Sequence, residues 1–253
     1  MNAIRIIVAL MLREMSSTYG RHVGGYVWAI LEPIGALTIL SIAFSLAFKA
    51  PAIGDIFPLF YATGYLPFML WMDTSNKIAQ SIRFSRQLLY YPPVGFLHAI
   101  LARFFISIVT HGLVFVIIMN GICTFFDYNA HLNYLSIINS LLMSSALAIS
   151  VGTLNCFLAT RFPTWEKIWQ IFTRPAFLAS GIFFIYGGIP EPLKSYLWFN
   201  PLIHIVGSMR HGFYPTYSAD YVSAMYVYIL SIILITLGLL LLSIHYKKLL
   251  NDL

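Results

Sequence analysis

The feature that most constrains this chain is a series of six apolar stretches, each long enough to cross a lipid bilayer as a helix. They lie at residues 27–48, 58–80, 98–122, 136–159, 168–186 and 224–245. A helix needs about 20 apolar residues to cross the hydrocarbon core, and within lipid it satisfies its own backbone hydrogen bonds. The stretches therefore predict an all-α polytopic membrane protein with six transmembrane helices.

Charged residues are too scarce for a soluble fold. They make up 9% of the 253 residues, and hydrophobic residues make up 59%, whereas soluble domains are about 25% charged. We expect residues 1–253 to form a single transmembrane domain without a sizeable soluble domain. The two cysteines, Cys123 and Cys156, fit neither a metal site nor a disulfide framework, so we interpret both as packing residues.

The placement of lysine and arginine predicts the orientation, because cytoplasmic loops are enriched in both. With a cytoplasmic N-terminus, twelve of the 15 basic residues fall on the inner side. The other three, Lys49, Lys194 and Arg210, fall on the outer side. We therefore expect both termini to be cytoplasmic.

The first 25 residues are too polar to span, and we expect them to form an interfacial helix and a joint. Arg5, Ala9 and Arg13 share one helical stripe, which is typical of an amphipathic helix lying in the membrane interface. The start of a signal anchor is the alternative. The stretch YGRHVGGYVWAILEP, residues 19–33, follows. Its glycines permit a turn, and Tyr26 and Trp28 mark the headgroup level.

Charged residues inside spans are costly and are candidates for function. Glu32 lies near the inner end of the first span, and we expect Pro33 to bias it away from helical angles. Glu32 is either a gate at the inner mouth of a channel or a carboxylate that pins the joint through groups such as Arg21. In the second span, Asp73 and Lys77 are four residues apart, so they are expected to pair on one helix face. A proton relay would need more carboxylates than these spans carry.

Two inner loops resemble short interfacial helices. Residues 82–95 combine an amphipathic piece with a double proline, and residues 160–170 contain Thr164, which is placed to cap a helix. Both loops are suited to contact a soluble partner. Anchoring by basic residues and tryptophan is the alternative.

One outer segment is unsuited to be a span. Residues 199–214 are short and carry His204, Arg210 and His211. We expect the region 187–214 to form a re-entrant or interfacial hairpin before the last span, because irregular backbone at membrane depth must pack in protein or line water.

Small residues at four-residue spacing mark the fourth span and predict close helix packing, within or between subunits. They are Ser140, Ser144, Ala148 and Gly152.

Aromatic residues form a second stripe, on one face of the outer half of the second span. Aromatic belts are common at this level, but aromatic rings also pack on sugar rings, and tyrosine hydroxyls meet sugar oxygens. A sugar-contacting wall is therefore the competing interpretation. The stripe consists of Phe57, Tyr61, Tyr65 and Phe68, and the outer end of the fifth span adds Phe183, Phe184 and Tyr186.

The sequence contains no catalytic constellation. It has no phosphate-binding loop GxxxxGK[ST] and no GxSxG elbow. No metal site is predicted. A transporter, channel or scaffold is expected rather than an enzyme, and no nucleic-acid partner is expected.

Taken together, these features resemble the membrane subunit of ABC-2 type exporters, most closely the capsular-polysaccharide export permeases of Gram-negative bacteria. The resemblance rests on the lead YGRHVGGYVWAILEP, the six spans, the two short inner helices, the outer re-entrant region and NPLIHIVGSMR. It covers essentially the whole chain.

The resemblance implies a homodimer in the bacterial inner membrane, driven by two copies of a separate ATPase that binds ATP and Mg²⁺. The exported substrate would be a lipid-linked acidic polysaccharide, passed to a periplasmic adaptor or co-polymerase and an outer-membrane channel. Alternatives are an ABC-2 exporter of O-antigen, a teichoic-acid-like polymer, a lipid or a drug. A stand-alone membrane transferase would need a constellation that is absent.

The same resemblance assigns roles to residues. A substrate path would include Glu32, Tyr61, Tyr65, Phe68, Phe183 and Phe184, and an inner gate or joint would include Arg21, His22, Tyr26 and Trp28. Contact with the ATPase is expected of Arg83, Arg86, Gln87, Thr164, Trp165, Glu166 and Lys167. The outer re-entrant region would depend on Asn200, His204 and Arg210.

Overall fold

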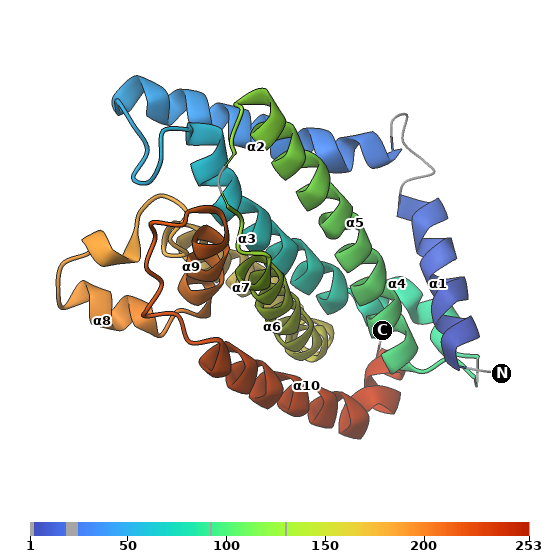
Figure 1. The fold of residues 1–253 in the computed structure, drawn as a ribbon. Helices are drawn as coiled ribbons and strands as arrows, with labels where there is room; N and C mark the ends of the chain where they lie inside the picture. The colour runs from blue at the N-terminus through green and yellow to red at the C-terminus, as the bar shows by residue number, and fades with distance from the viewer. Residues whose placement is uncertain (1–2, 19–24, 92, 130, 253) are drawn as a thin grey trace.

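The computed structural model describes residues 3–18, 25–91, 93–129 and 131–252, and all regular structure in these ranges is helical. Both the first turn of α1 and the last turn of α10 lie at one end of the bundle (Figure 1). The elements are α1 (Ala3–Thr18), α2 (Gly25–Ala47), α3 (Phe57–Ala79), α4 (Ser81–Leu89), α5 (Phe96–Phe125), α6 (Tyr134–Arg161), α7 (Trp165–Leu178), the 3₁₀ turn η1 (Tyr186–Gly188), α8 (Leu193–Trp198), α9 (Pro201–Phe213) and α10 (Ala224–Asp252).

Four helices in the described ranges are long and apolar enough to cross a membrane. They are Val27–Ala47, Phe96–Phe125, Tyr134–Arg161 and Ala224–Tyr246. These four match the first, third, fourth and sixth predicted spans. The all-helical, membrane-protein class expected from the sequence is therefore confirmed.

The second and fifth predicted spans correspond to less typical helices, and the count of six stays a prediction. Helix α3 is 23 residues long, but it is buried between α5, α6, α9 and α2, so it faces protein more than lipid and need not be strongly apolar. Helix α7 has 14 residues, contains Pro175 and ends at Leu178, before the predicted end of the fifth span at residue 186. At 1.5 Å per residue, it is too short to span on its own.

Small residues let α6 pack closely against its neighbours, as the four-residue spacing predicts. The hydroxyl of Ser140 donates to the carbonyl of Ile205 in α9 at 2.7 Å, and that of Ser144 donates to the carbonyl of Pro67 in α3 at 2.6 Å. A Cβ at Gly152 would lie 2.7 Å from the Cβ of Ile78. Within this protomer, the stripe is therefore a packing face.

Helix α1 docks on the N-terminal half of α5. Ile6 and Leu10 are buried, and so is Glu14 one turn later. The carboxylate of Glu14 lies 3.1 Å from the Nε atom of Arg103 in α5. Burial raises the pKa of Glu14, and Arg103 acts in the opposite direction. The predicted stripe of Arg5, Ala9 and Arg13 is exposed on another face.

Arg103 in α5 contacts three neighbouring helices. Its guanidinium donates to the carbonyl of Lys77 at the end of α3 and lies 4.2 Å from the ring centroid of Phe84 in α4. With the Glu14 contact, one buried cation holds α1, α3 and α4 around α5. Helix α4 follows α3 after a single residue, Gln80, and is the first short inner helix predicted.

The second predicted short inner helix is not a separate element. Residues 165–170 form the first turns of α7. Thr164 precedes this helix, but its side chain makes no capping hydrogen bond, so the predicted cap is wrong. The reason is the backbone: φ is −72° and ψ is −16° at Thr164, whereas a capping residue normally adopts extended angles.

The packing of α6 against α3 gives a direct test. Replacing Gly152 by alanine forces Ile78 or the backbone oxygen of Ser75 to move, since that oxygen would lie 2.9 Å from the new Cβ. Overpacking of this kind costs about 1–3 kcal/mol, so we expect a lower thermal midpoint of the purified protein in detergent. Gly112→Ala in α5 is the matched control, because a Cβ there meets nothing within 4 Å. Equal midpoints for the two variants would contradict the packing.

Candidate functional site

Charged side chains from three helices line a cavity of about 450 Å³. Helix α2 contributes Glu32 and the exposed Trp28, α3 contributes Asp73 and Lys77, and α5 contributes His111. The remaining lining residues are Gly25, Ala29, Pro33, Met69, Thr110 and Val114. Ionisable groups within membrane-spanning helices usually line functional cavities, so this is the candidate site.

The structure changes the partner predicted for Asp73. Its Oδ2 atom lies 3.5 Å from the Nε2 atom of His111, and within the described ranges Lys77 forms no ion pair with it. Lys77 lines the same cavity instead. Reasoning from sequence missed His111, although a histidine in the middle of an apolar span is itself a signal of a functional position.

Glu32 sits one helical turn after Trp28, so both side chains reach the same cavity. Glu32 is exposed and Pro33 is buried. The expectation that Pro33 would bias Glu32 away from helical angles is wrong, because both lie inside α2. A proline at this position cannot donate to the carbonyl four residues earlier, which belongs to Ala29 in the cavity lining.

Three of the four residues predicted to form the inner gate or joint cannot be placed in this site. Arg21 and His22 lie outside the described residues, and the side chain of Tyr26 is also outside the description. The proposed pinning of Glu32 through Arg21 therefore stays a prediction. Trp28 is the member whose position is known, with 60% of it exposed.

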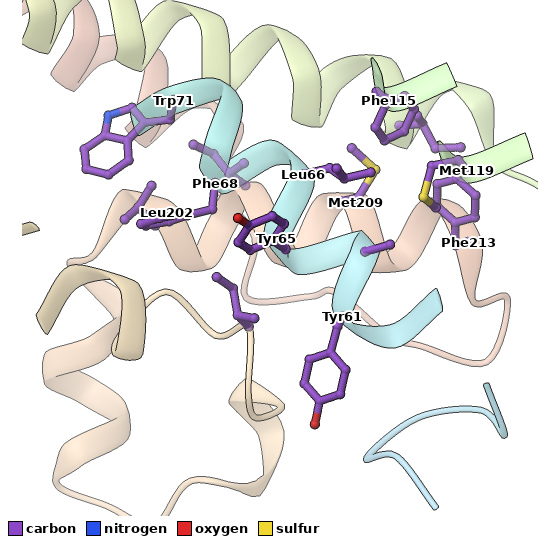
Figure 2. Packing of buried hydrophobic residues seen from close by; sticks show 14 of the residues in the cluster. Tyr61, Tyr65, Leu66, Phe68, Trp71, Phe115, Met119, Leu202, Met209 and Phe213 are labelled. Atoms are coloured by element: carbon purple, nitrogen blue, oxygen red, sulfur yellow. The ribbon is translucent and has the colours of Figure 1, made fainter. Parts of the chain in front are cut away.

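The predicted aromatic wall is part of the hydrophobic core. Tyr61, Tyr65 and Phe68 are all less than 10% exposed. The ring of Phe183 lies 5.5 Å from that of Phe44 and 6.3 Å from that of Tyr61. Figure 2 shows the hydroxyl of Tyr61 pointing away from the other labelled side chains. The five rings Phe44, Tyr61, Phe68, Phe177 and Phe183 are called the outer aromatic cluster below.

The contacts of Phe184 differ from those of Phe183. It is half-buried, and its carbonyl accepts a hydrogen bond from Arg210 at 2.6 Å. The sequence could not distinguish the two phenylalanines, because the break in the helix after Leu178 decides where each one points.

The residues predicted to contact an ATPase fall into two groups. Arg83 in α4 pairs with Glu166 in α7 and also donates to the carbonyl of Ala159 in α6. The indole of Trp165 donates to Asn155 at 2.9 Å. These contacts bind α4, α6 and α7 to one another. The second group, Gln87, Thr164 and Lys167, is exposed, and Arg86 is half-buried.

The predicted outer residues Asn200, His204 and Arg210 all hold the backbone of the outer segment. Asn200 caps α9 by accepting from the N–H of Leu202 at 3.1 Å and donates to the carbonyl of Ala179 at 2.8 Å. His204 is fully buried and joins the carbonyl of Trp198 to the N–H of Ser223, at 2.8 and 3.1 Å.

Arg210 is the most deeply buried cation of this segment, at 1% exposed. Besides Phe184, it donates to the carbonyl of Ile182 at 2.9 Å, and it stacks 4.2 Å from the ring centroid of Phe60. The sequence singled out all three outer residues but gave no indication that they satisfy backbone atoms. Within the described residues, no group of three histidine, cysteine, aspartate or glutamate side chains is placed to hold a metal ion.

Comparison with known proteins identifies the family. The ABC-2 type transporter family model matches residues 5–214, which includes the cavity, the inner contacts and the buried arginine. The chain belongs to the ABC-2 type transporter family.

Several relatives align with nearly the full length of the chain. The polysialic acid transport protein KpsM of Escherichia coli is 29% identical over 233 residues, which cover 92% of this chain and 90% of KpsM. The capsule polysaccharide export inner-membrane protein CtrC of Neisseria meningitidis is 28% identical over 238 residues, covering 93% and 89%. BexB of Haemophilus influenzae, with the same description as CtrC, is 27% identical with the same coverage.

The burial of Tyr61 and Tyr65 leads to a prediction about stability. Their alanine variants should lose about 3 kcal/mol, as is usual for an aromatic residue removed from a core, and should melt at lower temperature. Tyr61→Phe and Tyr65→Phe should melt like the unchanged protein, because neither hydroxyl makes a hydrogen bond within the described residues. Alanine variants with an unchanged midpoint would contradict the core role. Export by the stable phenylalanine variants would then report separately on sugar contacts.

Proposed function

We propose that this chain is the membrane-spanning subunit of an ATP-driven transporter that exports capsular polysaccharide across the inner membrane. The observation that carries the proposal is the similarity, over about nine-tenths of both chains, to inner-membrane proteins described as exporting capsule polysaccharide. Membership of the ABC-2 family supports an ATPase on a separate subunit. The substrate would be a lipid-linked acidic glycan.

The proposal includes the assembly expected from the sequence. Two copies of this chain form the membrane part, and two ATPase subunits bind ATP and Mg²⁺ on the cytoplasmic side. A periplasmic adaptor or co-polymerase and an outer-membrane channel receive the polymer. Each copy crosses six times with both termini cytoplasmic, and residues 187–214 form the re-entrant outer region. The ends of α1 and α10 lie at one end of the bundle, which supports placing both termini on the same side of the membrane (Figure 1).

Coupling to the ATPase would act through α4 and the first turn of α7. Arg83 connects α4 to both α6 and α7, so a push on α4 reaches two further helices at once. The exposed Gln87 and Lys167 and the half-buried Arg86 lie beside this connection and are available to a soluble partner. Arg103 carries the same movement to α1, because it touches both α4 and Glu14.

The path of the glycan would begin near Trp28 and Glu32 and continue toward the outer aromatic cluster. An exposed indole and a carboxylate suit sugars, whose ring faces pack on aromatic rings and whose hydroxyls donate to oxygen. In that cluster Tyr61 carries the hydroxyl, which points away from the other side chains labelled in Figure 2, and the residue is 3% exposed. Weak, repeated contacts of this kind let a polymer slide without being trapped.

The export activity is tested by deleting the chain in its host. Cells without it should lose surface polysaccharide and accumulate the polymer inside, because synthesis continues while the route across the inner membrane is absent. Immunolabelling of intact and of lysed cells measures the two pools. Restoring the chain on a plasmid is the control. Unchanged surface polysaccharide, or loss of both pools, would contradict an export role.

The coupling role of Arg83 is tested by charge reversal. Arg83→Glu and Glu166→Arg should each assemble with the ATPase and hydrolyse ATP, yet export several-fold less, because α4 no longer connects to α7. The double variant should recover part of the export, since it restores an ion pair of opposite sense. Lys49→Glu is the control, because Lys49 is exposed and lies outside both α4 and α7. Full export by both single variants would show that the pair does not transmit movement.

A further inference from the structure

Two apolar hollows lie beside the charged cavity along the seam between α2 and α5, and together they are called the apolar groove. A second hollow of about 380 Å³ shares Ala29, Thr110 and Val114 with the charged cavity and is bounded by Met11 and Met15 of α1. A third, of about 540 Å³, shares Ile117 with the second and continues along the outer halves of both helices. Each volume falls in the range of small-ligand sites, roughly 300–1,000 Å³.

The two parts of this seam differ sharply in chemistry. The charged end holds two carboxylates, Glu32 and Asp73, beside the ammonium of Lys77 and the imidazole of His111. The groove is lined almost entirely by aliphatic and aromatic side chains, including Ile34, Leu37, Ile118 and Phe125. Contact between α2 and α5 is sparse, so the groove stays open along much of its length. A lipid, in which a polar headgroup is joined to apolar acyl chains, matches this division.

The mixture of positive and negative side chains in the cavity determines which lipid headgroup fits it. A purely anionic head would find one lysine but face two carboxylates. A head with a phosphate and a primary ammonium satisfies both signs, because the phosphate pairs with Lys77 and the ammonium donates to Glu32 and Asp73. The Nε2 atom of His111 also lines this cavity, where it lies 3.5 Å from Oδ2 of Asp73 without forming a hydrogen bond within the described residues.

We propose that this seam binds one molecule of phosphatidylethanolamine, with its headgroup in the charged cavity and its acyl chains in the apolar groove. Lys77 lies in the last turn of α3, at the inner end, and the groove extends from there toward the outer end of α5. The headgroup therefore lies at the end of the seam near Lys77, and the acyl chains run past the middle of α5 toward Phe125. The lipid fills the space between α2 and α5 and holds α2 against α1 and α5. The lipid proposal does not rest on the identity of the exported polymer, although Trp28 and Glu32 of this cavity also stand at the start of the proposed glycan path.

Native mass spectrometry of the purified full-length chain tests the proposal. Phosphatidylethanolamine, phosphatidylglycerol and phosphatidylcholine with identical acyl chains are titrated separately. We expect one equivalent of phosphatidylethanolamine to bind about tenfold more tightly than the other two, the value of one hydrogen bond to a charged group. Phosphatidylcholine lacks the N–H groups that donate to carboxylates. Equal retention of all three lipids, or many equivalents without one preferred, would overturn the proposal.

Variants assign the two halves of the site. Glu32→Gln and Asp73→Asn should remove the preference for phosphatidylethanolamine over phosphatidylglycerol, and Lys77→Gln should weaken binding of both. Glu32→Asp, which keeps the charge, and Lys49→Gln, an exposed outer residue, are the controls. Thermal melting verifies that each variant is folded. An unchanged preference in folded Glu32→Gln and Asp73→Asn would refute the headgroup assignment.

The groove is tested separately by filling it. A Cβ at Gly121 meets nothing within 4 Å, and this residue lines the outer hollow. Gly121→Leu should therefore fold normally and weaken binding of all three lipids alike. Gly112→Leu, in open space on the same helix but outside the lining of the seam, is the matched control. Unchanged lipid binding by Gly121→Leu would place the acyl chains elsewhere.

Discussion

A buried backbone carbonyl outside a helix needs a donor from the protein itself, and this requirement shapes the segment between α7 and α9. After α7 ends at Leu178, the chain runs without a helix through Ile182 to η1. Arg210 donates to the carbonyls of Ile182 and Phe184, and Asn200 donates to that of Ala179. Because Arg210 is almost fully buried, these bonds are formed away from water. No carboxylate pairs with Arg210 within the described residues, so the two carbonyls and the ring of Phe60 compensate its charge.

The outer aromatic cluster depends on that arrangement. Phe183 lies between the two residues whose carbonyls Arg210 holds, and its ring packs 5.2 Å from Phe177 in α7 and 5.5 Å from Phe44 in α2. The irregular segment thus joins helices that otherwise touch little. At the inner end, Arg103 and Arg83 play a comparable part, since each connects helices through a backbone carbonyl and a carboxylate. Three arginines therefore add polar connections between helices that the hydrophobic core also holds together.

The charged cavity occupies the part of the molecule that these contacts leave loosely packed. Helix α2 packs on α3 more than on α5, and its inner turns carry the exposed Trp28 and Glu32. Under the coupling proposed above, α2 would respond to movement of α1 and α4 through α5, which contacts all three helices. An occupant of the seam between α2 and α5 would influence that response, which connects the lipid proposal to coupling without making either depend on the other.

The amino-acid sequence by itself determined the membrane class, four helices long and apolar enough to span, and the short helix at α4, and it singled out Asn200, His204 and Arg210. These follow from local composition and spacing, since a run of apolar residues or a costly buried charge is visible one segment at a time. Tertiary structure alone decided the rest. Asp73 pairs with His111 because α5 packs on α3, although Lys77 is nearer in sequence. Tyr61 and Tyr65 are buried because α2, α7 and the segment after it cover the face of α3 that the stripe occupies. Spacing within one helix identifies a face, whereas the helices that pack against that face decide what it meets.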